Sequence, residues 1–398
     1  MKYYRINKHI ATSTYTSPNG LKETYIFITG INNSTRFSDV LKTLNTFVDH
    51  AIDCTGISMH ALMFSRVYLS DVENQKRSLL TSLVYSRLCS GVVSVIGQPL
   101  LSGDAVSVLL YFVDGVLRKP LNHGFSGYRH VIDDDPWCNE LIFEGRNYNM
   151  LWVANYTADT NEDAYSQTKT LLTRINTTLE SHNLTMRNNL LRTWLYIRDV
   201  DNHYLGMANA RRKSFEQFGL KRDSRFPAST GIEGKAHSSN RFVSMDGVAI
   251  SGLREEQIVK MEARDYICPT IQYGVTFERG IRIRFGDRSH LHISGTASIN
   301  NKGQVMYPGD ILKQTERVIT IISALLDTQN ASMNQMAYII LYLRDPSHYE
   351  IVKNYLLKNI SHDIPLIPVA AAVCRPGWLV EMEGVAIVPD KTSFPPFL

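Results

Sequence analysis

The chain lacks the features that would tie it to a zinc site, a membrane or nucleic acid. Its five cysteines lie far apart and form no Cys-X-X-Cys pair, so neither a disulfide framework nor a zinc site is predicted. No run of 18 apolar residues occurs, and the first residues hold no apolar signal-peptide core. The 42 basic and 38 acidic side chains are too balanced to indicate a polyanion-binding surface. We therefore expect a cytoplasmic protein that binds neither membrane nor nucleic acid.

Cofactor motifs are missing as well. Gly103 and Gly124 belong to no Gly-X-Gly-X-X-Gly or phosphate-binding loop. His290 and His292 alternate along a predicted strand without a third ligand nearby, which favours a polar sheet face over a metal site. The sequence therefore predicts no cofactor and no metal. With 398 residues and 44% hydrophobic content, the chain has enough apolar material for two or three cores.

One pentapeptide pattern occurs three times. It reads VYLSD at residues 67–71, LYIRD at 195–199 and LYLRD at 341–345. Each copy follows a segment with helical spacing of apolar residues and precedes a second such segment. The order strand, helix, strand, helix, strand, strand recurs in each third of the chain, so chance recurrence of a short apolar string is an unsatisfactory explanation.

This pattern predicts an α+β protein of three tandem units, each a mixed sheet with two helices on one face. We place the units at residues 1–125, 126–260 and 261–398. Because helices on one face leave the other face of each sheet bare, the three bare faces are expected to pack around a common axis. The prediction is a pseudo-trimer around a central barrel, present as a monomer with internal pseudo-threefold symmetry, and with binding sites in the clefts between units.

The last two units share a second string. VSMDGVAI at residues 243–250 corresponds to VEMEGVAI at residues 380–387, and within it Ser244 is replaced by Glu381. The repeats agree on the apolar framework and differ at this one buried-strand position by a carboxylate. Glu381 is therefore the leading candidate for a functional residue, with a salt-bridged carboxylate at a domain interface as the structural alternative.

Several strings resemble known families. Residues 290–389, with Gly309-Asp310 and Gln314-Thr315 opening a long helix and Leu379 to Gly384 near the end, resemble the RidA/YjgF family, whose members form trimers with sites between subunits. From about residue 149 onward the chain resembles the chorismatases, which join RidA-like units in one chain. That likeness is carried by RFPASTGI (225–232), TFERG (276–280), SGTASI (294–299) and VCRP through LVE (373–381).

The chorismatase resemblance implies hydrolysis of chorismate to pyruvate and either 3-hydroxybenzoate or a dihydroxycyclohexadiene carboxylate. RidA-type imine deaminases carry an arginine on the strand before the final glutamate, whereas residues 365–372 contain none. Imine deamination is thereby disfavoured. It remains an alternative, together with a non-catalytic small-molecule binding protein of the RidA type; the ribonuclease or translation-inhibitor label of that family has no support in charge or motifs.

Chorismate is a dianion with an enol ether, and hydrolysing an enol ether requires protonation of its methylene carbon. A carboxylic acid that is desolvated, or set beside another carboxylate, stays protonated near neutral pH and can serve as donor. Glu381 fits this role, with Glu383 two residues on and on the same strand face. Cys374 matches the cysteine of the branch that forms 3-hydroxybenzoate; alternatively it is a small buried thiol that fills core space.

Two substrate carboxylates call for cations, and the planar guanidinium of arginine suits them. The family-like strings supply the candidates for substrate binding, each of which has a purely structural alternative: Arg225, Arg279, Ser229, Thr230, Gly231, Gly280 and, more weakly, Tyr273. The first unit has no counterpart of Glu381 or Arg225, so it is expected to be structural. The expected partner is a small dianionic molecule.

Overall fold

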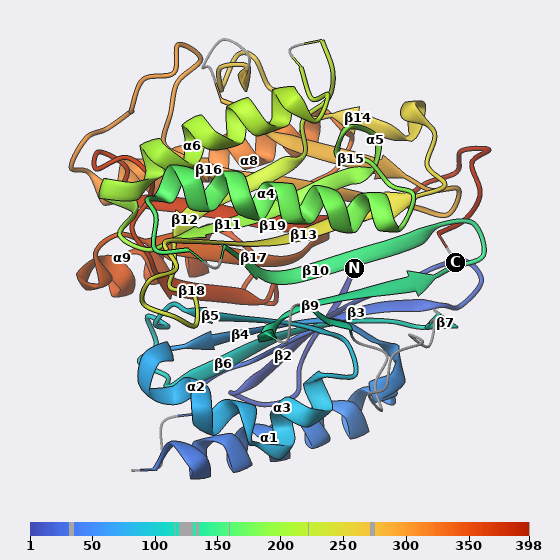
Figure 1. Ribbon diagram of the computed structural model, residues 1–398. Coiled ribbons are helices and arrows are strands. Elements are labelled where there is room, and N and C mark those ends of the chain that lie inside the picture. Colours follow the sequence, from blue (N-terminus) through green and yellow to red (C-terminus); the bar gives the residue numbers. More distant parts are fainter. Residues whose placement is uncertain are drawn as a thin grey trace.

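A computed structural model describes residues 1–31, 36–115, 117–118, 130–132, 135–158, 160–221, 223–270 and 275–397. It contains three mixed sheets, and each sheet has helices against one face (Figure 1). The predicted core order of strand, helix, strand, helix, strand, strand is present three times, with additional strands ahead of each copy. We call the three sheets with their helices units 1, 2 and 3.

Unit 1 has six strands in the order β1-β2-β3-β6-β4-β5. Helix α1 packs through the apolar stripe that the sequence predicts, including Val40, Leu44 and Val48, and ends at Gly56 in a left-handed conformation. The elements are β1 (Lys2–Arg5), β2 (Ile10–Thr16), β3 (Lys22–Ile28), α1 (Phe37–Thr55), β4 (Leu62–Leu69), α2 (Val72–Leu80), α3 (Leu83–Leu88), β5 (Val92–Gly97) and β6 (Val106–Val113).

Unit 2 has seven strands along the path β12-β11-β13-β10-β9-β7, with β8 against β9. Its elements are β7 (Leu117–Arg118), β8 (His130–Ile132), β9 (Asp135–Glu144), β10 (Asn149–Thr157), α4 (Ala164–Ser181), α5 (Met186–Asn189), β11 (Leu190–Ile197), α6 (Val200–Gln217), β12 (Ala228–Glu233) and β13 (Val243–Ser251). The division at 125/126 stays a prediction about folding units, because the second sheet already begins at Leu117.

Unit 3 has six strands in the order β14-β15-β16-β19-β17-β18. Asp310 caps its long helix by accepting a hydrogen bond from the Lys313 backbone N–H at 3.0 Å. The elements are β14 (Ile258–Lys260), β15 (Gly280–Arg284), β16 (Arg288–Ala297), α8 (Ile311–Asp327), β17 (Met336–Leu343), α9 (Tyr349–Asn359), β18 (Leu366–Ala370) and β19 (Val380–Pro389).

The helices lie on the outside and the sheets face one another, with α1 to α3 on the opposite side of the molecule from α4 and α6 (Figure 1). The inner faces form one large apolar cluster with side chains from all three units, among them Tyr111, Trp152 and Tyr338. The predicted closed barrel is not observed in the described residues. The three sheets stay separate, joined by side-chain packing and isolated bridges such as Gly97↔Lys235, Leu100↔Val369 and Ile232↔Val373.

The register confirms the alignment of the repeats. Each pentapeptide tyrosine lies opposite a residue of the neighbouring antiparallel strand: Tyr68 opposite Ser107, Tyr196 opposite Ser244, and Tyr342 opposite Glu381. Position 381 is thus the same place in the fold as positions 107 and 244, where serines stand. The carboxylate is an addition that the sheet itself does not require.

Candidate active site

Glu381 lies in a pocket between units 2 and 3. It sits on β19 between Tyr342 of β17 and Ala297 of β16, and 4% of its surface is exposed. Unit 2 contributes α6 and β12, and unit 3 contributes β16, β19 and the segments before β15 and β19. The lining residues are Tyr204, Arg211, Ser229, Gly231, Val275, Phe277, Arg279, Gly295, Ala297, Ile299, Cys374, Arg375, Trp378 and Glu381.

The Glu381 carboxyl is held in a state that favours its proton. Burial, followed by the negative charge of Glu383, raises its pKa from 4.5 to about 8, although Arg192 and Arg279 oppose the rise. Its oxygen lies directly over Gly295, where an added Cβ would overlap with Glu381 Oε1. Within the described residues no hydrogen bond fixes this carboxyl. Its surroundings therefore favour the protonated form near neutral pH.

Glu383 lies two residues after Glu381 on the same strand face and has hydrogen-bond or ion-pair contacts with four side chains. It accepts hydrogen bonds from Trp194 Nε1 at 2.9 Å and from the Tyr342 hydroxyl at 3.1 Å. The buried guanidinium of Arg192, on β11 of unit 2, forms an ion pair with it, and the Thr230 hydroxyl donates to it as well. Glu383 thus has several hydrogen-bond donors, whereas among the described residues no hydrogen bond to the Glu381 carboxyl is found.

Three arginines border the pocket. Arg279 is buried, and its Nε donates to the Cys268 carbonyl at 3.2 Å. Arg211 of α6 is also buried, and donates to Thr276 Oγ1 at 3.1 Å and Ser229 Oγ at 3.4 Å. Arg375 lies over the Trp378 ring at 5.1 Å. Guanidinium groups from both units therefore converge on the space in front of Glu381, which suits a ligand with more than one carboxylate.

Cys374 lies in the same pocket as a thiol. Burial, with the Glu381 charge as the next contribution, raises its pKa to about 12, and its sulfur hydrogen-bonds to the Tyr204 hydroxyl. A thiol with so high a pKa does not act as a thiolate nucleophile near neutral pH. It offers a weak hydrogen bond and a compact apolar surface next to the acid.

The three predicted binding residues on β12 do not all face the pocket, because successive residues of a strand point to opposite sides of the sheet. Ser229 and Gly231 point into the pocket, so the structure brings them together with Glu381, Cys374 and Arg279. Thr230, between them, points to the opposite face and bonds to Glu383 and Arg192. The hydroxyl of Thr230 therefore contacts Glu383 and not the pocket.

Two predicted residues lie elsewhere, and one cannot be placed. Arg225 does not line the pocket, because its guanidinium donates to the carbonyls of Arg187, Asn188 and Leu190 at 3.0 to 3.1 Å, at the end of α5. At Gly280 an added Cβ would overlap with the His292 carbonyl and crowd Met261, so this glycine permits close strand packing. Tyr273 lies outside the described residues.

Sequence reasoning missed Arg211, Arg375 and Tyr204. Arg375 stood inside a quoted string, and Arg211 and Tyr204 lie seven residues apart on one helix, a spacing that puts both on one face. The structure also shows which strand faces the acid across the interface. It is β12 of unit 2, and not residues 365–372 of unit 3, and β12 contains no arginine either.

The pocket is narrow, with a volume of about 40 Å³. That is room for a few water molecules, so a ring-sized ligand requires lining side chains to move outward. Among the residues that the structure describes, no group of three or more His, Cys, Asp or Glu side chains could hold a metal ion. His290 instead bonds to Glu23 at 2.9 Å in the buried interface between units 1 and 3. In the described part of the chain no helix is both long and apolar enough to cross a membrane.

Comparison with known proteins identifies the family. The sequence model of the endoribonuclease L-PSP family matches residues 282–388. A RutC family protein of Pyrococcus abyssi is 30% identical over 98 residues, covering 24% of this chain and 76% of the relative. A 3-hydroxybenzoate synthase of Streptomyces hygroscopicus is 24% identical over 223 residues, which are 50% of this chain and 64% of the relative's length.

A crystal structure of chorismatase superposes with a TM-score of 0.62 at 16% identity, covering 82% of this chain and 93% of that one. This likeness extends the shared fold well beyond the C-terminal unit. Through unit 3 the chain therefore belongs to the RutC family, whose region the endoribonuclease L-PSP model also matches, and over most of its length it shares the fold of the chorismatase structure.

Proposed function

We propose that the pocket between units 2 and 3 cleaves the enolpyruvyl ether of chorismate, or of a closely similar dianion, with Glu381 as general acid. The observation that carries this proposal is a buried carboxyl with a pKa of about 8, bordered by Arg211, Arg279 and Arg375. The similarity of half the chain to a 3-hydroxybenzoate synthase supports the same substrate class.

In this proposal Glu381 transfers its proton to the methylene carbon of the enol ether. Water adds to the cationic carbon of the resulting oxocarbenium ion and its proton returns to Glu381; the bond between that carbon and the ring oxygen breaks, and pyruvate leaves with the dihydroxycyclohexadiene carboxylate. When a neighbouring ring hydroxyl captures the ion instead, water releases pyruvate from the resulting ketal, and loss of one water from the ring gives 3-hydroxybenzoate. The guanidinium groups hold the two carboxylates, and the negative charge of Glu383 raises the pKa of Glu381 and so favours its protonated form. No step requires a cofactor. Because Cys374 lines the same pocket as Glu381, its side chain would influence which product forms.

The direct test is incubation with chorismate, with pyruvate measured by a coupled assay and the ring product by chromatography. Wild type is expected to release pyruvate, and Glu381→Gln to lose at least about 100-fold in kcat, the usual scale of a general acid. Glu350→Gln, on the exposed face of α9, is the matched control and should keep wild-type turnover. Turnover by Glu381→Gln at the wild-type rate would overturn the assignment, as would wild type that binds chorismate without releasing pyruvate.

Product analysis of Cys374→Ala tests the second residue. We expect a shift from 3-hydroxybenzoate toward the dihydroxycyclohexadiene carboxylate, because a smaller side chain leaves room for water. An unchanged product ratio would remove Cys374 from the chemistry.

We further propose that the active form is a single chain. The three units, assigned to residues 1–125, 126–260 and 261–398, occupy the three positions of a RidA-like pseudo-trimer. Size-exclusion chromatography with light scattering should give a mass near 45.1 kDa. A trimer of whole chains would contradict this.

A further inference from the structure

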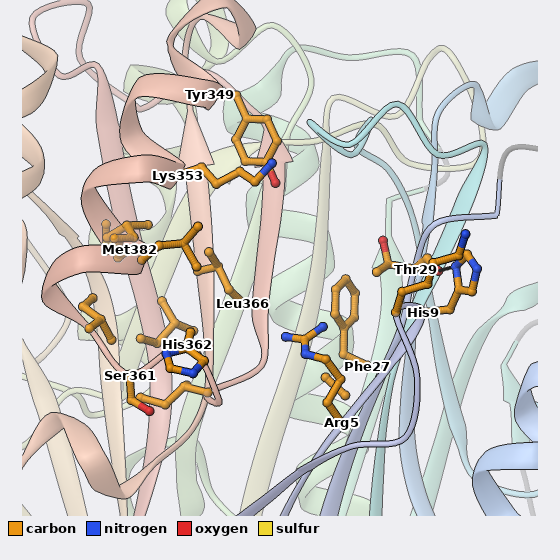
Figure 2. Close-up of a pocket in the computed structure, with 17 residues that line it drawn as sticks. Arg5, His9, Phe27, Thr29, Tyr349, Lys353, Ser361, His362, Leu366 and Met382 are labelled. Atoms are coloured by element: carbon orange, nitrogen blue, oxygen red, sulfur yellow. Dashed lines mark hydrogen bonds between the residues drawn. The ribbon is translucent and has the colours of Figure 1, made fainter.

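A second and larger cavity lies between units 3 and 1. Its volume is about 310 Å³, against about 40 Å³ for the Glu381 pocket. Its walls come from β1 to β3 of unit 1 and from α9 and β18 of unit 3 (Figure 2). The lining residues are Arg5, Lys8, His9, Ala11, Phe27, Thr29, Ile339, Tyr349, Lys353, Leu356, Leu357, Ile360, Ser361, His362, Ile364, Leu366 and Met382.

This cavity is the repeat-related counterpart of the Glu381 pocket. At the Glu381 pocket, the second helix and the following strand of unit 2 (α6 and β12) meet unit 3. At the larger cavity, the second helix and the following strand of unit 3 (α9 and β18) meet unit 1. Leu366 pairs with Ile339 as Ser229 pairs with Thr193, at the same distance before each pentapeptide. In unit 1, Ser107 occupies the position that corresponds to Glu381 of unit 3. The Ser107 hydroxyl lies 3.3 Å from the hydroxyl of Thr29, which lines the cavity.

At the third interface, between units 1 and 2, two asparagine side chains occupy the space beside the edge strand of unit 1. Asn139 and Asn155 reach across from unit 2 and bond to the free backbone edge of β5: the Val93 and Val95 N–H groups each donate to one of the two amide oxygens at 2.9 Å. Both amide nitrogens donate to the Val93 carbonyl. Between units 3 and 1, in the part of the chain that the structure describes, no side-chain amide of unit 1 bonds to the edge of β18, and the backbone bonds of residues 99–101 to that strand lie at Pro368 and Ala370, beyond the cavity lining.

The charge around the cavity has one sign. Arg5 and Lys8 come from unit 1 and Lys353 from unit 3, with His9 and His362 at the rim, and no acidic side chain lines the cavity. Arg5 and Lys353 extend into it from opposite walls (Figure 2). Within the described residues, no carboxylate lies within 4 Å of the cationic groups of Arg5 or Lys8, and Lys353 has only a solvent-exposed pair with Glu350 at 3.3 Å.

Two carboxylates lie near the cavity without lining it. Asp363 is exposed and lies 3.9 Å from His362, and Asp104 is buried behind the wall, where it accepts hydrogen bonds from Gly30, Ser102 and the lining residue Thr29. The pair of Lys353 with Glu350 is solvent-exposed and therefore weak, so a ligand anion can displace it. Between the cations the floor is apolar, formed by Phe27, Leu366 and Met382 among others.

We propose that this cavity is a second binding site, for a small carboxylate on an aromatic or similar apolar ring. The ring would lie on the apolar floor, and the carboxylate between Arg5 and Lys353. Because Ser107 replaces the acid, the site is expected to bind such a molecule without converting it. This inference does not depend on turnover of chorismate at the Glu381 pocket.

The test uses 4-iodobenzoate as the probe. Its iodine is located by anomalous diffraction from soaked crystals, and its affinity is measured by calorimetry. We expect an anomalous peak in the cavity, and at least about tenfold weaker binding in Arg5→Gln/Lys353→Gln, equivalent to loss of about 1.4 kcal/mol. The matched control is Lys2→Gln/Lys358→Gln, which removes the same charges from the same strand and helix outside the cavity and should change affinity less than about twofold.

Several outcomes would overturn the proposal. One is an iodine peak confined to the Glu381 pocket, or no binding at millimolar probe. Another is wild-type affinity in Arg5→Gln/Lys353→Gln. Equal competition by inorganic phosphate would show that charge alone is recognised and would remove the apolar ring from the ligand class. Wild-type chorismate turnover in Arg5→Gln/Lys353→Gln is expected and keeps the two sites distinguishable.

Discussion

At position 381 the chain carries a carboxyl group in a setting that opposes its ionisation. Burial and Glu383 both raise the pKa of Glu381, and the sheet accepts a serine at the two equivalent places. The surroundings that raise this pKa have two effects: ionisation of Glu381 opposes folding near neutral pH, and the folded protein retains a proton that the carboxyl can donate. The protonation state of Glu381 therefore bears on turnover and on stability.

The first prediction concerns the pH dependence of turnover. Since the proposed mechanism needs protonated Glu381 and its pKa is about 8, kcat should be flat below about pH 7 and fall as the pH rises through 8. A pH profile of kcat in wild type measures this. A profile that rises through pH 8 would mean that Glu381 acts as a base.

The second prediction concerns stability. The folded-state pKa of Glu381 lies above 4.5, so ionisation of the unfolded chain destabilises the fold as the pH rises from about 4.5 to 8, by about 1.4 kcal/mol per pKa unit as an upper scale. Glu381→Gln removes this penalty. Thermal unfolding should show the variant more stable than wild type at pH 8 and equal to it near pH 4. A lower Tm for the variant at pH 8 would indicate that the carboxylate is bound as a structural ion.

The sequence could single out Glu381 as a candidate, because two repeats differ there by a carboxylate, whereas their other difference, Asp246 against Glu383, keeps one. It could not tell Ser229 from Thr230, since the pleat of β12 decides which of the two faces the pocket. The sequence also could not tell that Arg211, and not Arg225, lines the pocket between units 2 and 3. Both are arginines of unit 2, and the choice between them depends on how α6 packs on unit 3, which no local sequence pattern contains.

At the scale of elements, Arg225 joins the end of α5 to β11 and should act on stability alone. Arg225→Ala leaves three carbonyls without their donor and is expected to cost about 1–3 kcal/mol in unfolding free energy, with KM for chorismate within about twofold of wild type. Arg279→Ala, in the pocket, should instead raise KM by at least about tenfold. Denaturant unfolding and steady-state kinetics of both variants test these two predictions. If Arg225→Ala raised KM as much as Arg279→Ala, Arg225 would be a substrate-binding residue after all.

Long amphipathic helices and buried strands were predictable because their periodicity is strong, as in α1 and α8. Elements at the sheet edges were not. The strands β1, β2 and β9 occur in stretches rich in polar residues or aromatics, and they form because another strand offers its free edge.

At the scale of the whole molecule, each pair of units is joined by a buried ion pair. Arg66 binds Asp246 between units 1 and 2, Arg192 binds Glu383 between units 2 and 3, and Arg288 binds Glu23 between units 3 and 1. All six side chains are at most 2% exposed. Such pairs disfavour any arrangement of units that would leave the charges unmatched.

Removing one partner should therefore be severe. Arg192→Leu leaves Glu383 buried and uncompensated, and is expected to cost about 3–5 kcal/mol. Arg192→Leu/Glu383→Leu should recover much of that loss in thermal unfolding, because no lone charge remains. A double variant no more stable than the single one would show that the pair contributes by shape and not by charge.

The pairing of each pentapeptide tyrosine with position 107, 244 or 381 has an evolutionary meaning. In a ring of identical subunits, any substitution at this place would be copied into every cleft at once, acid and serine alike. Linking the units covalently lets each cleft change by itself, so that one carries Glu381, a second is occupied by Asn139 and Asn155 and a third is lined by cations, each through changes in a different stretch of the same gene.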